Sequence, residues 1–261
     1  MFRNIGAGKR DMSFRQDRPW EGKMTPFKLF GNVYYVGTYQ ACCYLIETGD
    51  GLIMIDPGYK NTAYLVVNSV RDLGFDFKDI KYIICTHWHY DHSEATAAFK
   101  DLSGATTMIG ENDFERAKEY FTADKVIKDG DTLTLGNTTI RFMETPGHTK
   151  GTISFFFDVT EDGKTYRAGS FGGAGANKLG KNTQEFEGAR VAYRNSLERL
   201  RKEKVDLFIG NHSWNNGTYE KSIKLLETGE NTFLDSTLWQ KFLDFCEGRL
   251  DNLEKAEEQQ G

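Results

Sequence analysis

The sequence predicts a mixed α/β (α+β) fold in which strands precede helices in each of two successive halves. Two hairpin signals support this prediction. Asp50-Gly51 separates the strand-like runs 44–47 and 52–55, and Gly136-Asn137 separates the runs 132–135 and 138–143. A third observation is an amphipathic stripe near the C-terminus. Segments of this kind permit a layered architecture of sheets and helices.

The first half continues from its hairpin into a helix that Asn61 can cap and that reaches about Leu73. An apolar strand follows over residues 80–85 and leads into a histidine-rich loop. After the loop, a helical stretch opens at Ser93-Glu94. A strand at 106–109 and a helix beginning near Glu111 complete this half.

In the second half, the hairpin is followed by strands at 153–159 and 164–168, a helix over roughly 184–202 and a strand at 205–209. The last helix covers about 235–259, and its apolar residues recur at helical spacing: Leu238, Phe242, Phe245, Cys246, Leu250 and Leu253. We expect this stripe to dock on the chain's own core. The alternative is a dimer interface, so a monomer or a homodimer is expected.

Length and composition favour one compact unit. A chain of 261 residues is long enough for one large or two ordinary domains, but no Pro/Gly/Ser-rich linker divides it. We therefore predict a single domain over residues 1–261, with an N-terminal extension over about 1–20. Hydrophobic residues make up 39% of the chain and aromatic residues 13%, which is ample for a core.

Charge and apolar patterning restrict the partners. The net charge of −5 at pH 7 gives no broad basic surface for nucleic acid. No apolar run reaches the length of a membrane span, and the N-terminus lacks the apolar core of a signal peptide. We expect a small-molecule substrate, no nucleic acid and no membrane. We expect the protein to be cytoplasmic as written, or periplasmic or secreted if a leader was removed. The four cysteines are expected to be buried free thiols.

All five histidines of the chain can be assigned to a metal site. His87, His89 and His92 crowd the run from Thr86 to His92, and His148 and His212 stand alone downstream. A single isolated histidine is usually a surface or core residue, but three imidazoles and a carboxylate within so short a run indicate a cation. Sites rich in histidine nitrogen and carboxylate oxygen suit zinc.

The position of this run also suggests a functional site. It directly follows the predicted strand 80–85, and open α/β sheets place their sites at strand C-termini. In an extended segment, His87, His89 and Asp91 would share one side, while His92 would face the other. We therefore expect this one loop to serve two metals.

The sequence resembles the metallo-β-lactamase superfamily over nearly its whole length. Three motifs carry the resemblance in the expected order: residues 52–58 ending in Asp56-Pro57-Gly58, the histidine run, and residues 145–151 around His148. Residues 26–37 and 186–212 look most like the third subclass of class B β-lactamases. The resemblance implies an αββα sandwich, in which two sheets pack face to face with helices outside.

The same resemblance implies two zinc ions per chain. By position, the first zinc would be held by His87, His89 and His148, and the second by Asp91, His92 and His212. Each zinc would keep an open position, as catalytic zinc does. A metal-bound hydroxide would then attack a carbonyl carbon, with Asp91 as the catalytic carboxylate that orients it.

The resemblance places Asp56 outside the ligand set, where its carboxylate would accept a hydrogen bond from the second ring nitrogen of a ligand histidine and fix the orientation of that ring. On the residues alone, a turn-starting role before Pro57-Gly58 is an equal alternative for Asp56.

One position departs from many members of the superfamily. An Asp that bridges both metals is common there, whereas this chain has Gly169-Ser170. The third lactamase subclass has a Ser at this point, so Ser170 fits that pattern. We expect the second zinc to be the weaker one. Ser170 and Lys178, with Lys181 as a further choice, are the expected substrate contacts.

Three function classes follow from this resemblance. The first is hydrolysis of the β-lactam amide, as expected of an antibiotic-resistance enzyme. The alternative is a cytoplasmic zinc hydrolase of another cyclic amide, lactone, ester or thioester with little lactamase activity. A diiron redox protein is a third class, but that branch usually has Glu at the position of His89 and adds a flavin domain.

Overall fold

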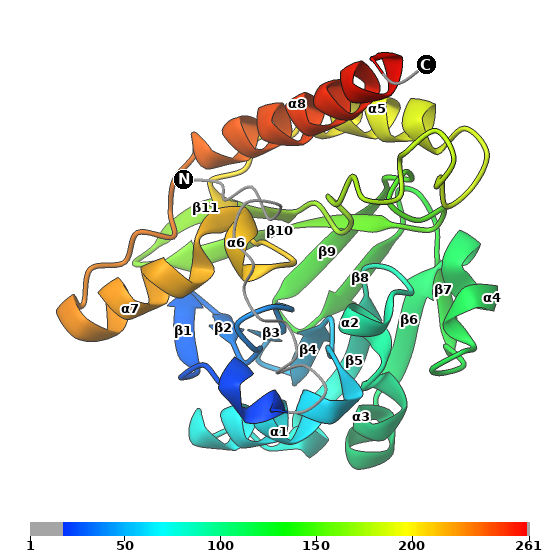
Figure 1. Ribbon diagram of the computed structural model, residues 1–261. Helices are drawn as coiled ribbons and strands as arrows, with labels where there is room; N and C mark the ends of the chain where they lie inside the picture. The colour runs from blue at the N-terminus through cyan, green and yellow to red at the C-terminus, as the bar shows by residue number, and fades with distance from the viewer. Residues whose placement is uncertain (1–17, 260–261) are drawn as a thin grey trace.

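The computed structural model describes residues 18–259, which form two β-sheets packed face to face with helices on their outer sides (Figure 1). The first sheet has seven strands in the order of the chain: β1 (Phe27–Phe30), β2 (Val33–Tyr35), β3 (Tyr44–Glu47), β4 (Leu52–Ile55), β5 (Ile80–Cys85), β6 (Thr106–Gly110) and β7 (Lys125–Ile127). The second has five, in the order β12 (Leu207–Phe208), β11 (Lys164–Ser170), β10 (Ile153–Glu161), β9 (Thr138–Glu144) and β8 (Thr132–Leu135).

The first sheet changes direction at β4. Strands β1 to β4 form an antiparallel meander, and β4 to β7 run parallel to one another. Parallel neighbours need crossover connections, and α1 (Ala63–Asp72) and α3 (Thr96–Ser103) lie in those between β4 and β6. The C-terminal ends of β4 and β5 therefore lie together at one edge of the sheet, where the histidine-rich loop begins.

The second sheet is antiparallel from β8 to β11, and β12 adds to β11 in parallel. Its outer side is covered by α5 (Ala189–Leu200) and α8 (Leu238–Glu258) (Figure 1). Trp239, Phe242, Leu243, Cys246 and Leu250 of α8 are buried against that sheet. The prediction that the C-terminal stripe docks on the chain's own core is thus confirmed.

Three apolar layers explain why both sheets have two buried sides. The largest cluster lies between the sheets and includes Ile46, Phe142 and Phe155. A second cluster joins the second sheet to α5 and α8, and a third joins the first sheet to α1 and α3. Burial of apolar surface on both faces of each sheet fixes the four-layer order helix, sheet, sheet, helix. The expected αββα sandwich is the observed fold.

Short helices complete the described chain. They are α2 (Tyr90–Ser93), α4 (Phe114–Ala117), α6 (Ser213–Asn216) and α7 (Thr218–Thr228), with 3₁₀ turns η2 (Pro19–Gly22), η3 (Lys60–Thr62), η4 (Phe77–Asp79) and η5 (Glu111–Asp113). Among the described residues, no helix combines the length and apolar character that crossing a membrane requires. All four cysteines are buried free thiols, as expected.

Several predicted element ends were wrong. Asn61 does not cap α1, because it lies inside η3, and Thr62 precedes the helix without a side-chain cap. The long helix of the second half begins at Ala189, because Gly188 in the left-handed region (φ 80°) precedes it. Helix α7 was not predicted; Tyr219, Ile223 and Leu226 on it are exposed, so it lacks a strong apolar stripe facing inward.

Candidate metal centre

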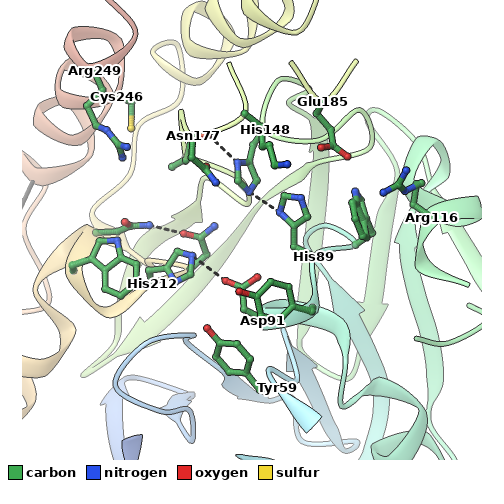
Figure 2. Close-up of a pocket in the computed structure, with 18 of the residues that line it drawn as sticks. Tyr59, His89, Asp91, Arg116, His148, Asn177, Glu185, His212, Cys246 and Arg249 are labelled. Carbon is green, nitrogen blue, oxygen red and sulfur yellow. Dashed lines mark hydrogen bonds and ion pairs between the residues drawn. The ribbon is translucent and has the colours of Figure 1, made fainter. Parts of the chain in front are cut away.

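The predicted ligands come from three separate segments of the chain that meet at the edge of the sandwich (Figure 2). His87 and His89 lie in the loop after β5, and Asp91 and His92 lie in α2. His148 comes from the loop between β9 and β10. His212 directly precedes α6 and is held in place by an isolated β-bridge to Ala41.

The histidine-rich run was expected to be extended, and this prediction is wrong for its second part. The backbone turns into α2 at Tyr90, where the backbone N–H groups of His92 and Ser93 donate to the carbonyl of His89 at 2.9 and 3.0 Å. The Ser93 hydroxyl also donates to the carbonyl of Trp88 at 2.7 Å. Successive residues of a helical turn point in different directions, so Asp91 borders the open cavity while His92 is completely buried.

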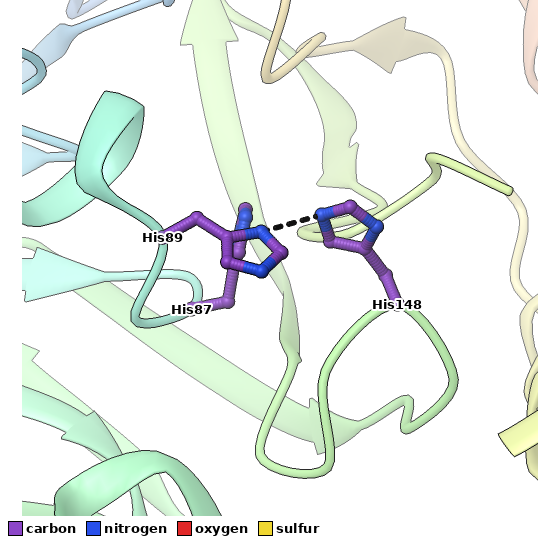
Figure 3. A group of neighbouring side chains, drawn as sticks. All are labelled: His87, His89 and His148. Atoms are coloured by element: carbon purple, nitrogen blue, oxygen red, sulfur yellow. Dashed lines mark hydrogen bonds between the residues drawn. The ribbon is translucent and has the colours of Figure 1, made fainter. Parts of the chain in front are cut away.

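The structure brings all six predicted ligands together. The ligand atoms of His87, His89 and His148 lie within 4.8 Å of one another, and Figure 3 shows how these three imidazoles converge. The ligand atoms of His87, Asp91 and His92 satisfy the same limit. His212 joins the second group, because its Nε2 lies 3.3 Å from His92 Nε2 and 3.6 Å from Asp91 Oδ2.

Hydrogen bonds at the outer ring nitrogens indicate which nitrogen faces the centre. Nδ1 of His148 donates to the carbonyl of Gly175 at 2.8 Å, and Nδ1 of His212 donates to the carbonyl of Gln40 at 3.1 Å. Nδ1 of His92 donates to the Asp56 carboxylate at 2.9 Å. A neutral imidazole that carries its proton on Nδ1 has a lone pair on Nε2. All three Nε2 atoms therefore present lone pairs to the centre.

His87 and His89 complete this pattern. The Thr86 hydroxyl donates to Asp56 at 2.8 Å, so its oxygen can accept a hydrogen bond from Nδ1 of His87 at 3.1 Å. Among the buried side-chain nitrogen and oxygen atoms of the described residues, only His87 Nε2 has no hydrogen-bond partner. His89 presents Nδ1, which lies 2.9 Å from His148 Nε2. The lone pairs of these imidazole nitrogens converge on one point, and one of the nitrogens, His87 Nε2, is buried without a hydrogen-bond partner among the described residues. This arrangement fits a zinc site.

The electrostatics of the centre keep most of these imidazoles neutral. Burial, together with neighbouring imidazoles, lowers the pKa of His87 well below its usual value and that of His89 to about 3. Burial also lowers the pKa values of His148 and His212 to about 4. Burial opposes ionisation of Asp91, but the charges of His92 and its neighbours outweigh it and lower the pKa of that carboxyl. A neutral imidazole and an ionised carboxylate are the forms that bind a metal.

Asp56 supports the second group of ligands from behind. Its carboxylate accepts hydrogen bonds from the backbone N–H of Thr86 at 2.7 Å and from Nδ1 of His92 at 2.9 Å. The residue occupies the left-handed region with φ 51°, which is unusual for a non-glycine residue. Such strain persists where surrounding contacts enforce it, and here those contacts point at a predicted ligand.

Asp113 supports the first group, and sequence reasoning missed it. This buried carboxylate, from η5, accepts from the backbone N–H of Trp88 at 3.1 Å and of Gly151 at 2.7 Å. It also accepts from the Thr149 hydroxyl at 2.6 Å. Asp113 thus connects the loop of His87 and His89 to the loop of His148. No sequence signal marked it, because its partners are far away along the chain.

A cavity of about 530 Å³ opens beside the ligands (Figure 2). The lining includes His89, Asp91, His148 and His212, and also Lys178, which was expected to contact substrate. Trp214 lies flat on His212, with ring centroids 4.4 Å apart and planes 7° apart. This stack restricts the orientation of the imidazole, and sequence reasoning did not assign Trp214 a role.

Ser170 does not line this cavity, and neither does Lys181. Ser170 is only 1% exposed and pairs with Phe155 in the ladder between β11 and β10. Side chains alternate along a strand, so Ser170 and Gly169 face opposite sides of the sheet. A Cβ on Gly169 would lie 2.7 Å from Val205 and 2.8 Å from Phe156, both in the cluster under α5 and α8. Only Ser170 can therefore face the space between the sheets.

Two layers of sheet with a histidine- and aspartate-rich centre at their edge define a class of metal-binding αββα proteins. The family model described as the metallo-β-lactamase superfamily matches residues 36–212. The chain belongs to this superfamily.

Solved structures extend the match. BJP-1, a subclass B3 metallo-β-lactamase of Bradyrhizobium japonicum, is 26% identical with a TM-score of 0.84, covering 92% of this chain and 97% of that one. LRA-12, a class B3 di-zinc metallo-β-lactamase from an Alaskan soil metagenome, is 27% identical with a TM-score of 0.80, covering 91% of this chain and 97% of that one.

The chain is also similar in sequence to proteins named hydroxyacylglutathione hydrolase. A hydroxyacylglutathione hydrolase of Idiomarina loihiensis is 31% identical over 161 residues, which are 60% of this chain and 54% of the relative. The first three curated relatives all carry this name, and the chain spans between 51% and 60% of their lengths.

Proposed function

We propose that this protein is a dinuclear zinc hydrolase that attacks a carbonyl carbon, and that its substrate is a β-lactam amide. One observation carries the proposal: five imidazoles and Asp91 aim ligand atoms at one centre, with His87 Nε2 buried and unpartnered. Two zinc ions per chain are proposed, held by His87, His89 and His148 and by Asp91, His92 and His212. When bound, zinc supplies an activated water nucleophile at neutral pH and polarises the carbonyl group.

The residues of the chain have separable tasks in this reaction. Asp91, whose side chain is 18% exposed, borders the cavity with a carboxylate that is ionised at neutral pH. It can accept a hydrogen bond from the attacking water and so orient it. Asp56, through Nδ1 of His92, fixes the ring that presents Nε2. Lys178 at the cavity wall offers a positive charge to an anionic substrate.

The β-lactam assignment is supported by structural neighbours that match over nine-tenths of both chains. The alternative is hydrolysis of a thioester, lactone or ester. The names of the curated sequence relatives favour a thioester within that group. Both reactions would use the same metal centre. Substrate specificity would therefore depend on how residues of the cavity wall bind the substituents on either side of the scissile bond.

Elemental analysis and a substrate screen test the proposal. We expect two zinc ions per chain and turnover of at least one of nitrocefin, an acyl-homoserine lactone and S-lactoylglutathione. Chelation should abolish turnover and added zinc should restore it. The proposal would be overturned by a folded protein that binds one zinc or none, or that hydrolyses none of these substrates with two zinc ions bound.

Asp91→Asn provides the matched variant. It should keep the fold, since Asp91 borders the cavity, but lose the charge that binds the second metal. We expect kcat to fall by about a hundredfold or more, because the lost group acts at the reacting centre. Near-native turnover of this variant with two zinc ions bound would contradict the role of Asp91.

A further inference from the structure

A second cavity adjoins the metal cavity on the side of α8. It has a volume of about 340 Å³ and shares two residues, Asn177 and Arg249, with the metal cavity. Gly180 and Thr183 form its wall on the loop that follows β11, and Asn252 and Leu253 form its wall on α8. We call this second cavity the α8 groove. Together the two cavities form a path from the metal ligands to the C-terminal helix.

The outer wall of the α8 groove is tied to the helix. The backbone N–H of Lys181 donates to the Glu257 carboxylate at 2.6 Å, and the Arg190 guanidinium donates to the other oxygen of Glu257 at 2.5 Å. Arg190 also donates to the carbonyl of Leu179 at 2.5 Å. These bonds hold the loop against α8 at one end, so the groove is a built feature with two fixed walls.

Arg249 differs from the other arginines around α8. Arg190, Arg194 and Arg201 each pair with carboxylates of that helix, at 2.5 to 2.9 Å. Within residues 18–259, Arg249 has no carboxylate at ion-pair distance, and its guanidinium lies 6.0 Å from the ring centroid of Phe245. A half-buried guanidinium without a counter-ion is a strong binding group for a planar anion, because its donors match both oxygens of a carboxylate.

The junction between the two cavities lies beside a predicted ligand of the first metal. A Cβ added to Gly175 would lie 2.8 Å from Asn177 Oδ1 and 3.0 Å from His148 Cε1, so the Asn177 side chain is close to the His148 ring. Figure 2 shows Arg249 extending from α8 toward Asn177 and His148.

We propose that the α8 groove binds one arm of the substrate and that Arg249 pairs with a carboxylate on that arm. The inference rests on the proposed function, which places the scissile carbonyl at the metal ligands. It adds that the substrate is elongated and carries an anionic group a few atoms from that carbonyl. Arg249 is then a specificity-determining residue contributed by the C-terminal helix.

Binding of small carboxylates to the zinc-loaded protein tests this inference without requiring turnover. Glutarate and adipate each have one carboxylate for the metal centre and one for Arg249, whereas pentanoate and hexanoate have only the first. Hydrogen bonds to charged groups predict about a tenfold tighter binding of the dicarboxylates, measured by calorimetry. Arg249→Gln should remove this preference, and Arg249→Lys should retain part of it.

Arg71→Gln is the matched control, because Arg71 is exposed on α1 at the other face of the molecule and its loss changes the net charge equally. This variant should keep the native preference. Equal binding of mono- and dicarboxylates to the native protein, or a preference that survives Arg249→Gln, would overturn the inference. Zinc content and turnover are measured on the same preparations. A protein that binds no zinc or shows no turnover contradicts the proposed function. An active protein with two zinc ions that does not prefer dicarboxylates contradicts only the role of the α8 groove.

Discussion

The metal-free protein should lose stability when the pH falls from 7 to 5. The pKa values of His148 and His212 are lowered to about 4 by burial, whereas an unfolded histidine has a pKa of about 6.5. Between about pH 4 and pH 6.5, these two histidines are protonated in the unfolded chain but remain neutral in the folded protein. A lowered histidine pKa therefore gives full stability above about pH 6.5, and this stability is lost as the pH falls toward the folded pKa.

The size of the loss follows from the same shifts. Linkage gives about 2 kcal/mol for each of His148 and His212 between pH 7 and pH 5. Asp113 opposes this, because burial raises its pKa to about 6 and its protonation favours the folded state by about 1 kcal/mol. These three groups alone give a net loss of about 3 kcal/mol, a large part of the 5 to 15 kcal/mol by which domains are typically stable. His87 and His89, whose pKa values are also lowered, add to this loss, and His92, whose pKa is raised by Asp91 and Asp56, opposes it.

Urea unfolding of zinc-free protein at pH 7 and pH 5 measures this loss. His148→Asn removes one of the titrating groups. Between pH 7 and pH 5, this variant should therefore lose about 2 kcal/mol less unfolding free energy than the native protein loses. Adding zinc at pH 7 should raise stability, because zinc binds the neutral imidazoles assembled in the folded protein more tightly than it binds the unfolded chain. A native protein equally stable at both pH values, or a variant with the native pH dependence, would refute the reasoning.

Two further predictions concern the residues around the ligands. Asp113→Ala leaves the N–H groups of Trp88 and Gly151 unpaired, so we expect a loss of about 3 kcal/mol in unfolding free energy and weaker zinc binding at His148, measured by urea unfolding and chelator competition. If zinc affinity is unchanged, Asp113 does not position the ligands. Mild chelation should remove the two zinc ions stepwise, as measured by competition with a chromogenic chelator. Loss of both ions with one affinity would contradict a weaker second site.

The sequence by itself predicted the residues that meet at the candidate metal centre, and its resemblance to a known superfamily predicted the layers of the fold. The crowding of His87, His89 and His92 around Asp91 indicated metal binding, because such a local density of imidazoles has no other simple explanation. The hairpins at Asp50-Gly51 and Gly136-Asn137 also formed as predicted, since tight turns depend on local conformational preferences. These features are encoded over short distances along the chain.

Local patterns failed where distant contacts decide the backbone. Residues 90–92 were expected to be extended but lie in α2, and the sequence carries no direct sign of the Ser93 bond to Trp88 that supports this turn. Asn61 is a good capping residue, yet it lies inside η3. In both places the packed surroundings outweigh the small free-energy differences between local conformations.

Only the tertiary structure decided what surrounds the metal ligands. Asp113 and Arg249 are ordinary charged residues in the sequence, and their importance comes from what lies beside them. Asp113 meets two loops from different parts of the chain, and Arg249 faces two cavities without a carboxylate partner in residues 18–259. Burial and long-range contact exist only in the folded chain, so the candidate ligand residues were predictable from the sequence, whereas the shape and charge of the cavity beside them were not.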